Sequence, residues 1–172
     1  MITLKNGRGQ VGEKLKELID DIPYEIEENI EIYHTWNIED KSEDVQSKEL
    51  EKFIKYVNTV DENTIIVFIS TYMNQYNDYW KYKTIAESFL MEMTNNFIIL
   101  RLPLIIGKGT CQKFKENTIS PYGKMEIITL ERACEIIIDE SINSITPKVK
   151  RIEGSMVNAQ LIYDLIQFGK RK

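Results

Sequence analysis

The sequence predicts an α/β fold built around a largely parallel sheet. Short apolar runs alternate with helical patterns along the chain, which is typical of consecutive βαβ units. Two of the runs, IIVFI at 65–69 and FIIL at 97–100, are continuous rather than alternating, as expected for strands covered on both faces. The 172 residues suffice for one domain with a real core, and no change of composition marks a boundary, so we expect one domain over 1–172.

Each expected element has its own local signal. Strands are predicted where short apolar, β-branched runs occur, at 2–5, 30–35, 64–70, 97–102, 126–130 and 148–153. Helices are predicted where apolar residues recur every three or four positions, at 11–20, 47–57, 79–94, 130–141 and 158–168. The pair Asn95–Asn96 is a helix stop placed directly before the fourth strand.

Composition excludes several classes of function. The net charge of −5 argues against a nucleic-acid partner, and no apolar run approaches the ~20 residues that cross a membrane. Cys111 and Cys134 form no disulfide framework, and a single histidine, His34, rules out a His-rich metal site. We therefore expect a cytoplasmic protein with reduced thiols and without a metal, a nucleic-acid partner or a membrane span.

A glycine-rich turn follows the first predicted strand, in the stretch NGRGQVGEKL. Gly7, Gly9 and Gly12 have the GxGxxG spacing, and a helix begins within it. Glycines there permit a tight turn and close approach of the backbone to a pyrophosphate, which the helix N-terminus attracts. The pattern alone is also common as a simple strand–helix connection. It indicates a dinucleotide site only together with further signals.

The further signals follow the third predicted strand. Ser70 and Thr71 end that strand, and Tyr79 and Lys83 stand four residues apart, on one face of the next helix. An ammonium group near a phenol favours the phenolate and lowers the phenol pKa, which suits an acid–base catalyst. A surface YxxxK on an amphipathic helix is the alternative. The order of the three signals, each on the element it requires, favours the catalytic interpretation.

These motifs together resemble the short-chain dehydrogenase/reductase superfamily, in its extended branch of NAD-dependent epimerases, dehydratases and nucleotide-sugar reductases. GRGQVGEKL is similar to the opening turn of the dTDP-4-dehydrorhamnose reductase group, although in that spacing the first glycine falls at Asn6. Five further segments resemble the later motifs of the family in the correct order. They are IEIYHTW, VFISTYMN, YWKYKTIAE, FIILRLPLIIGKG and MEIITLERACEII. The resemblance covers nearly the whole chain and implies a Rossmann-like, doubly wound sheet with a minimal substrate lobe.

The resemblance implies a reductase or epimerase that acts on a carbonyl of a nucleotide-linked or related sugar. Tyr79 would exchange the proton, Lys83 would lower the phenol pKa and hold a ribose hydroxyl, and Thr71 or Ser70 would bind the carbonyl oxygen. The cofactor would be NAD or NADP. The residues implied in binding it are Gly7, Gly9, Gln10, Val11, Gly12, His34, Thr35, Lys83 and Leu104.

The chain departs from this family on the adenosine side of the site. Only DDIPYEIEEN separates the first helix from IEIYHTW, so the second strand, which normally carries a ribose-binding residue, is absent. Asp20 and Asp21 are the candidate substitutes for that residue, although their predicted position at a helix end argues against them. We therefore expect the chain to bind the dinucleotide more weakly than full-length members of the family do.

Two rival interpretations remain open at this point. One is a degenerate, non-catalytic relative that keeps the fold as a binding or scaffold module, and the other is an unrelated flavodoxin-like domain. The resemblance also implies a homodimer through the helices at 47–57 and 79–94, with the apolar stripe Ile85, Phe89 and Met93 at the contact. The sugar, the direction of reaction and the choice between NAD and NADP are not determined by the sequence.

Overall fold

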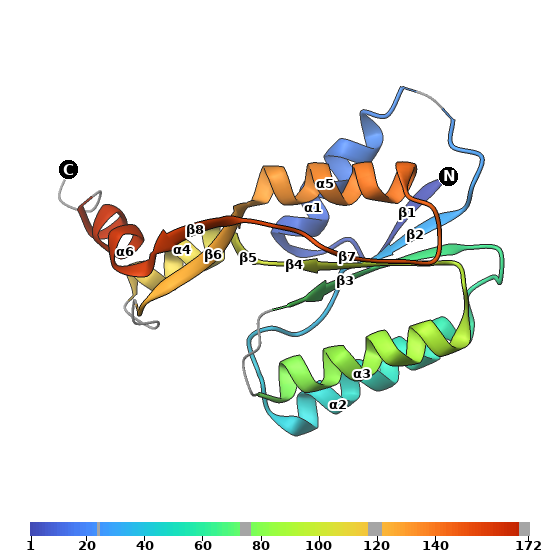
Figure 1. Ribbon diagram of the computed structural model, residues 1–172, viewed down its shortest axis with the longest axis horizontal. Coiled ribbons are helices and arrows are strands. Elements are labelled where there is room, and N and C mark those ends of the chain that lie inside the picture. Colours follow the sequence, from blue (N-terminus) through green and yellow to red (C-terminus); the bar gives the residue numbers. More distant parts are fainter. Residues whose placement is uncertain (24, 73–76, 117–121, 169–172) are drawn as a thin grey trace.

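The computed structural model describes residues 1–23, 25–72, 77–116 and 122–168. Its centre is a five-stranded, fully parallel sheet in the order β1-β2-β3-β4-β7 (Figure 1). The strands are β1 (Ile2–Lys5), β2 (Ile30–Tyr33), β3 (Ile65–Thr71), β4 (Phe97–Leu102) and β7 (Lys148–Arg151). The predicted α/β, doubly wound parallel sheet is therefore confirmed. A flavodoxin-like sheet is excluded, because that fold places its first strand inside the sheet and here β1 lies at the edge.

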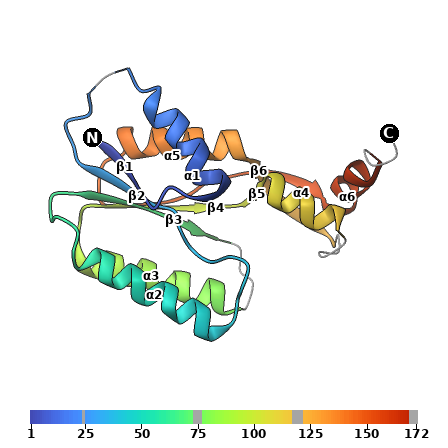
Figure 2. The same cartoon turned by 180° about the vertical axis from the view of Figure 1, so that it is seen from behind.

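Helices cover both faces of this sheet. The helices α1 (Gly9–Asp20) and α5 (Leu130–Asn143) lie on one face, and α2 (Glu43–Val57) and α3 (Asp78–Met93) lie side by side on the other (Figures 1 and 2). Side-chain caps fix two of the starts: Asn77 accepts a hydrogen bond from the Trp80 amide, and Thr129 accepts one from the Arg132 amide.

A smaller three-stranded unit projects from the carboxyl end of the sheet. Its strands are β5 (Leu104–Ile106), β6 (Lys124–Thr129) and β8 (Ser155–Asn158), with β6 parallel to β5 and antiparallel to β8. The helices α4 (Lys108–Lys115) and α6 (Ala159–Phe168) pack beside it (Figure 1). Sequence reasoning missed β5, β8 and α4, because each is three to eight residues long and none has a clear period of its own.

The predicted boundaries are wrong by a few residues in several places. The second strand ends at Tyr33 rather than at residue 35, and the α2 helix begins at Glu43 rather than at 47. The strand predicted at 126–130 begins earlier, at Lys124, and Leu130 already belongs to α5. The strand predicted at 148–153 ends at Arg151. The single-domain assignment over 1–172 stays a prediction.

The crossovers of the sheet do not all have the same hand. The chain adds β2, β3, β4 and β7 in the same direction, yet α1 and α5 lie on the opposite face from α2 and α3. The β1–β2 connection, and the β4–β7 connection that returns through α5, therefore have the opposite hand to the two connections between them.

Two apolar clusters fill the two layers. One lies between the sheet and α1 and α5, and contains Leu15, Ile32, Val67 and Ile137. The other lies between the sheet and α2 and α3, and is rich in aromatic rings, with Phe53 and Phe68 at a centroid distance of 4.5 Å.

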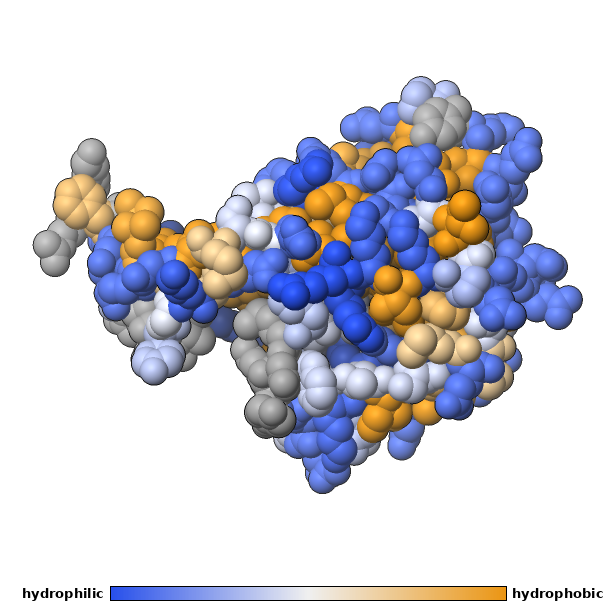
Figure 3. Space-filling model, in the orientation of Figure 1, coloured by the Kyte–Doolittle hydropathy of each residue, from blue (hydrophilic) through white to orange (hydrophobic). Residues whose placement is uncertain are grey.

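Apolar side chains also lie on the surface of the small unit, where Leu161, Leu165 and Phe168 of α6 are largely exposed (Figure 3). Within the described residues, no helix combines the length and apolar character needed to cross a bilayer.

A carboxylate cluster joins α5 to β7. Glu140 accepts hydrogen bonds from Lys148 (2.8 Å), Lys150 (2.5 Å) and Ser144 (2.7 Å). Burial by itself would raise the pKa of Glu140, but the hydrogen bonds from Lys148, Lys150 and Ser144 outweigh it and lower that pKa to about 2.

This cluster predicts an acid-sensitive step in stability. The folded pKa of Glu140 lies below its ordinary value of 4.5, so the stabilisation is present above pH 4.5 and is lost as the pH falls toward 2. Since the lysines are partly exposed, we expect Glu140→Gln to cost on the order of 1–2 kcal/mol at pH 7 and little at pH 2. Urea unfolding at several pH values measures this. Glu135→Gln, which breaks an exposed pair with Arg132 on the same helix, is the control, and an equal loss there would contradict the assignment.

Candidate functional site

The glycine turn has the backbone conformation that its sequence requires. Asn6 has φ +65°, Gly7 φ +28° and Gly9 φ +75°, which are left-handed values that favour glycine. Asn6 thus stands in a conformation where the related turn carries a glycine, and asparagine is one of the few other residues that adopt it readily. The turn directs the N-terminus of α1 toward the carboxyl end of the sheet, where that N-terminus attracts an anion.

Gly12 is needed for close packing rather than for conformation. A Cβ atom at Gly12 would lie 2.5 Å from the carbonyl carbon of Gly7 and 2.7 Å from Nε2 of His34. A Cβ at Gly9, by contrast, would meet nothing within 4 Å. The surface above Gly9 is therefore open, as the approach of a phosphate group requires.

His34 lies directly after β2 and packs against the glycine turn. Its Nε2 is 3.3 Å from the Arg8 carbonyl oxygen, and its Nδ1 is buried without a hydrogen-bond partner among the described residues. Burial lowers the pKa of His34, and the hydrogen bond to Arg8 opposes this only in part. The neutral imidazole is thus the favoured form. His34 therefore supports the turn as a neutral side chain.

The remaining cofactor residues implied by the resemblance lie around this turn. Gln10 extends from the first turn of α1 toward Gly107, where an added Cβ would lie 2.4 Å from the Gln10 Oε1. The sequence analysis did not name Gly107 as a site residue. The signal that could have found it is its place in FIILRLPLIIGKG, a segment that resembles one of the family motifs. Val11 is partly buried against the core, and Leu104 is half-buried in β5 opposite Ile127.

Lys83 is the most deeply buried cation described in the site. Its Nζ donates a hydrogen bond to the Ile69 carbonyl oxygen at 2.5 Å and lies 5.0 Å and 4.8 Å from the ring centres of Trp36 and Phe68. Burial lowers the pKa of Lys83 to about 7, although Glu87 and Glu49 favour the charged form. Trp36 is a packing residue, since it is buried and its Nε1 donates a hydrogen bond to the Gln46 Oε1 at 2.7 Å.

Tyr79 lies one turn before Lys83, packed against the same aromatic cluster. The Lys83 Nζ is 5.8 Å from the centre of the Tyr79 ring. Burial raises the pKa of Tyr79 to about 12, so the expectation that Lys83 lowers this pKa is wrong for the protein without ligands. The physical reason is that Lys83 is itself desolvated and turned toward Ile69, which leaves the phenol without a charge to stabilise its anion.

Ser70 and Thr71 point to opposite sides of β3. Phe68 belongs to the cluster facing α2 and α3 and Ile69 to the one facing α1 and α5, so alternation places Ser70 on the side of Tyr79 and Lys83 and Thr71 on the other. The Ser70 Oγ is buried and has no hydrogen-bond partner among the described residues. The geometry therefore favours Ser70 over Thr71 as the hydroxyl that accompanies Tyr79.

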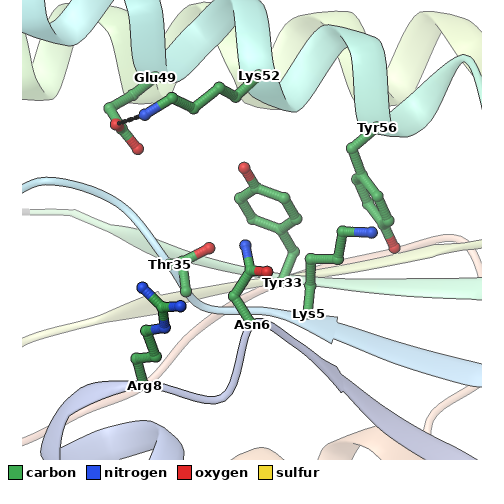
Figure 4. A pocket seen from close by; sticks show the side chains of 8 residues that line it. All are labelled: Lys5, Asn6, Arg8, Tyr33, Thr35, Glu49, Lys52 and Tyr56. Atoms are coloured by element: carbon green, nitrogen blue, oxygen red, sulfur yellow. Dashed lines mark hydrogen bonds and ion pairs between the residues drawn. The ribbon is translucent and has the colours of Figure 1, made fainter.

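A cavity of about 400 Å³ opens beside the glycine turn, between β1, the end of β2 and α2 (Figure 4). It is lined by Lys5, Asn6, Arg8, Tyr33, Thr35, Glu49, Lys52 and Tyr56. Of these, sequence reasoning named only Thr35 as a binding residue. Arg8 was detectable from its place inside the glycine turn, but Lys5 and Lys52 were not, because their approach to the turn depends on the packing of α2.

Two acidic candidates are not in this site. Asp20 ends α1 and Asp21 follows it, and a helix of 12 residues carries them ~18 Å from the turn, toward the amino end of the sheet. Asp21 lies in a shallow hollow against α5. Neither replaces the missing ribose-binding residue.

The residues present fit a dinucleotide. Three buried polar atoms at the carboxyl end of the sheet, the Gln10 Oε1, the His34 Nδ1 and the Ser70 Oγ, have no hydrogen-bond partner among the described residues. Buried polar atoms are normally hydrogen-bonded, so unpaired ones beside an open glycine turn indicate where a polar ligand binds. The chain also leaves β1 and β2 toward opposite faces of the sheet. The crevice between two such connections is where α/β sheets bind ligands.

Fold and site together define a Rossmann-like α/β protein with a glycine-rich turn between its first strand and first helix. The same fold occurs in the Bordetella bronchiseptica enzyme WbmG in complex with NAD (TM-score 0.74, 13% identity, 99% of this chain and 78% of that one). It occurs also in UDP-N-acetylglucosamine 4-epimerase from Bacillus cereus (TM-score 0.75, 12% identity, 94% and 78%). A third is dTDP-4-dehydrorhamnose reductase from Bacillus anthracis in complex with NADP (TM-score 0.75, 12% identity, 99% and 80%).

These likenesses confirm the fold expected from the motifs. The sequence itself matches no protein-family model and no curated protein.

Proposed function

We propose that this protein is an NAD(P)-dependent reductase or epimerase that acts on a carbonyl of a nucleotide-linked or related sugar. The observation that supports the proposal is the position of Lys83, whose Nζ donates to the Ile69 carbonyl oxygen on β3, with Tyr79 one turn earlier on the same helix and Ser70 on the same side of β3. The structural neighbours, which include enzymes crystallised with NAD or NADP and enzymes of nucleotide sugars, support the same class.

The side chains have separate tasks in this proposal. A bound nicotinamide supplies or accepts the hydride at the carbonyl carbon. In reduction, Tyr79 donates its phenolic proton to the oxygen. Ser70 or Thr71 donates a hydrogen bond to the same oxygen. Lys83 holds a ribose hydroxyl, which would draw its Nζ away from the Ile69 carbonyl.

A non-catalytic binding module of the same fold is the second candidate. The absence of an adenosine-side strand favours it, because β1 pairs only with β2 in the described part of the sheet. The raised pKa of Tyr79 also favours it, since the oxidative direction needs a phenolate. The unpaired Ser70 hydroxyl favours the enzyme.

Titration of the protein with NADH and NADPH tests the proposal. We expect binding, and we expect Gly9→Asp to abolish it by placing a carboxylate against the pyrophosphate. Gly123→Asp is a matched control, because Gly123 also has a positive φ (+65°) and open space around its Cβ position, but lies outside the site. Binding of neither cofactor by the wild type, or unchanged binding by a folded Gly9→Asp variant, would contradict the proposal.

A homodimer through α2 and α3 belongs to the same proposal. Of the predicted stripe, Ile85 and Met93 on α3 are 41% and 49% exposed, whereas Phe89 is partly buried against the aromatic cluster. We expect Ile85→Glu to convert a dimer into a monomer in light scattering, with a loss of at least roughly tenfold in association. Leu165→Glu, on the exposed face of α6, is the control, and dissociation by that variant instead would move the contact to the small unit.

A further inference from the structure

We infer that the cavity beside the glycine turn binds the adenosine end of the cofactor and that Arg8 and Lys52 hold a ribose 2′-phosphate there, so that the protein prefers NADP(H) to NAD(H). The inference rests on the proposed function and assigns a site to the half of the cofactor that has lost its usual strand.

The first argument is the charge of the cavity. Lys5, Arg8 and Lys52 line it against one carboxylate, Glu49, whereas the whole chain carries a net charge of −5. Glu49 is itself paired with Lys52 at 2.6 Å. Figure 4 shows the Arg8 guanidinium directed toward Thr35 at one end of the cavity, and the Lys52–Glu49 pair above it on α2. A cationic cavity in an acidic protein is a site for an anion, and arginine in particular binds phosphate with two hydrogen bonds.

The second argument is the position of the cavity along the cofactor. The pyrophosphate is expected at the N-terminus of α1, and the nicotinamide end extends toward Ser70 and Lys83 on the β3 side. The adenosine must then extend the other way, toward the edge strand β1. Asn6 and Arg8 belong both to the glycine turn and to the cavity wall, so the cavity begins where the pyrophosphate ends. Its volume of about 400 Å³ lies within the ~300–1,000 Å³ of ligand sites.

The third argument is that this face of the edge strand is polar. The residues of β1 and β2 that face α1 and α5 are apolar, Ile2, Leu4, Ile30 and Ile32. The alternate residues near the cavity include Lys5, whose Nζ lies 5.0 Å from the Tyr56 ring centre, and Glu31, which accepts a hydrogen bond from the Tyr56 hydroxyl at 3.1 Å. An apolar helix or strand from a partner would leave these charges buried and unpaired. A hydrated, charged ligand fits the face better.

Equilibrium titrations with four ligands test this inference by tryptophan fluorescence or calorimetry: NADPH, NADH, 2′,5′-ADP and 5′-ADP. We expect NADPH to bind at least about tenfold more tightly than NADH, and 2′,5′-ADP similarly more tightly than 5′-ADP, with a steeper salt dependence in each case. Arg8→Gln and Lys52→Gln should each remove most of this difference while leaving NADH affinity nearly unchanged. Glu49→Gln should increase the difference between NADPH affinity and NADH affinity. Arg132→Gln and Lys55→Gln, which remove equal charges on α5 and on the exposed side of α2, are the controls.

The outcomes separate this inference from the proposed function. Equal affinities for NADPH and NADH in the wild type would overturn the 2′-phosphate site and leave the proposed function standing. Equal weakening of NADPH binding and NADH binding by Arg8→Gln would also overturn the 2′-phosphate site, because Arg8 would then bind the pyrophosphate. Failure of all four ligands to bind would overturn both.

Discussion

Replacement of Tyr79 by phenylalanine should lower turnover by at least ~10²–10⁴-fold while the fold and cofactor affinity survive. The substitution removes one oxygen and keeps the ring that packs against the aromatic cluster under α3. A general acid contributes in this range because the alkoxide formed by hydride transfer needs a proton donor already in position. The measurement is the loss of reduced-nicotinamide absorbance in the presence of a keto-sugar nucleotide.

The control for this change is on the same helix. Tyr82→Phe removes a hydroxyl that donates to Glu43 at 3.2 Å on the surface, and should leave turnover unchanged. Ser70→Ala and Thr71→Val then decide which hydroxyl assists the phenol, and the geometry of β3 predicts the larger loss for Ser70→Ala. Full activity in Tyr79→Phe would end the catalytic assignment and leave the non-catalytic binding module as the remaining candidate.

Lys83→Met should separate function from stability. We expect this variant to lose cofactor binding and turnover, because it removes the ammonium group proposed to hold the ribose. It should nevertheless fold at least as stably at pH 7, since a methionine fills the space under Trp36 and Phe68 without the desolvation cost of a buried cation. Lys81→Met, which removes an exposed cation paired with Glu43 on the same helix, is the control and should leave cofactor binding unchanged.

The pH dependence of stability gives Lys83 a second readout. Its folded pKa of about 7 lies below the ordinary 10.5, so between these values the unfolded chain binds more protons than the folded one. Stability contributed by this group therefore rises as the pH increases from 7 toward 10, on the order of a few kcal/mol. Urea unfolding of wild type and Lys83→Met across this range should show the rise in the wild type alone. Parallel curves for the two proteins would show that burial does not lower the pKa of Lys83.

The sequence by itself determined the α/β class, the five strands of the parallel sheet and the order of the motifs. Continuous apolar runs such as 65–69 and 97–100 can hardly be placed anywhere but in a sheet covered on both faces, and YxxxK on a helix fixes two side chains to one face. It also indicated that the usual βαβ passage before β2 is missing, since the ten residues DDIPYEIEEN are too few to form it.

Only the tertiary structure decided which groups act on one another. The pKa of Tyr79 depends on burial against α2 and α3, and the sequence contains no measure of that burial. The choice between Ser70 and Thr71 depends on which side of β3 faces α3. The cationic cavity depends on bringing Lys5 of β1, Arg8 of the turn and Lys52 of α2 together across 47 positions of the chain, and local periodicity has no information about contacts at that separation.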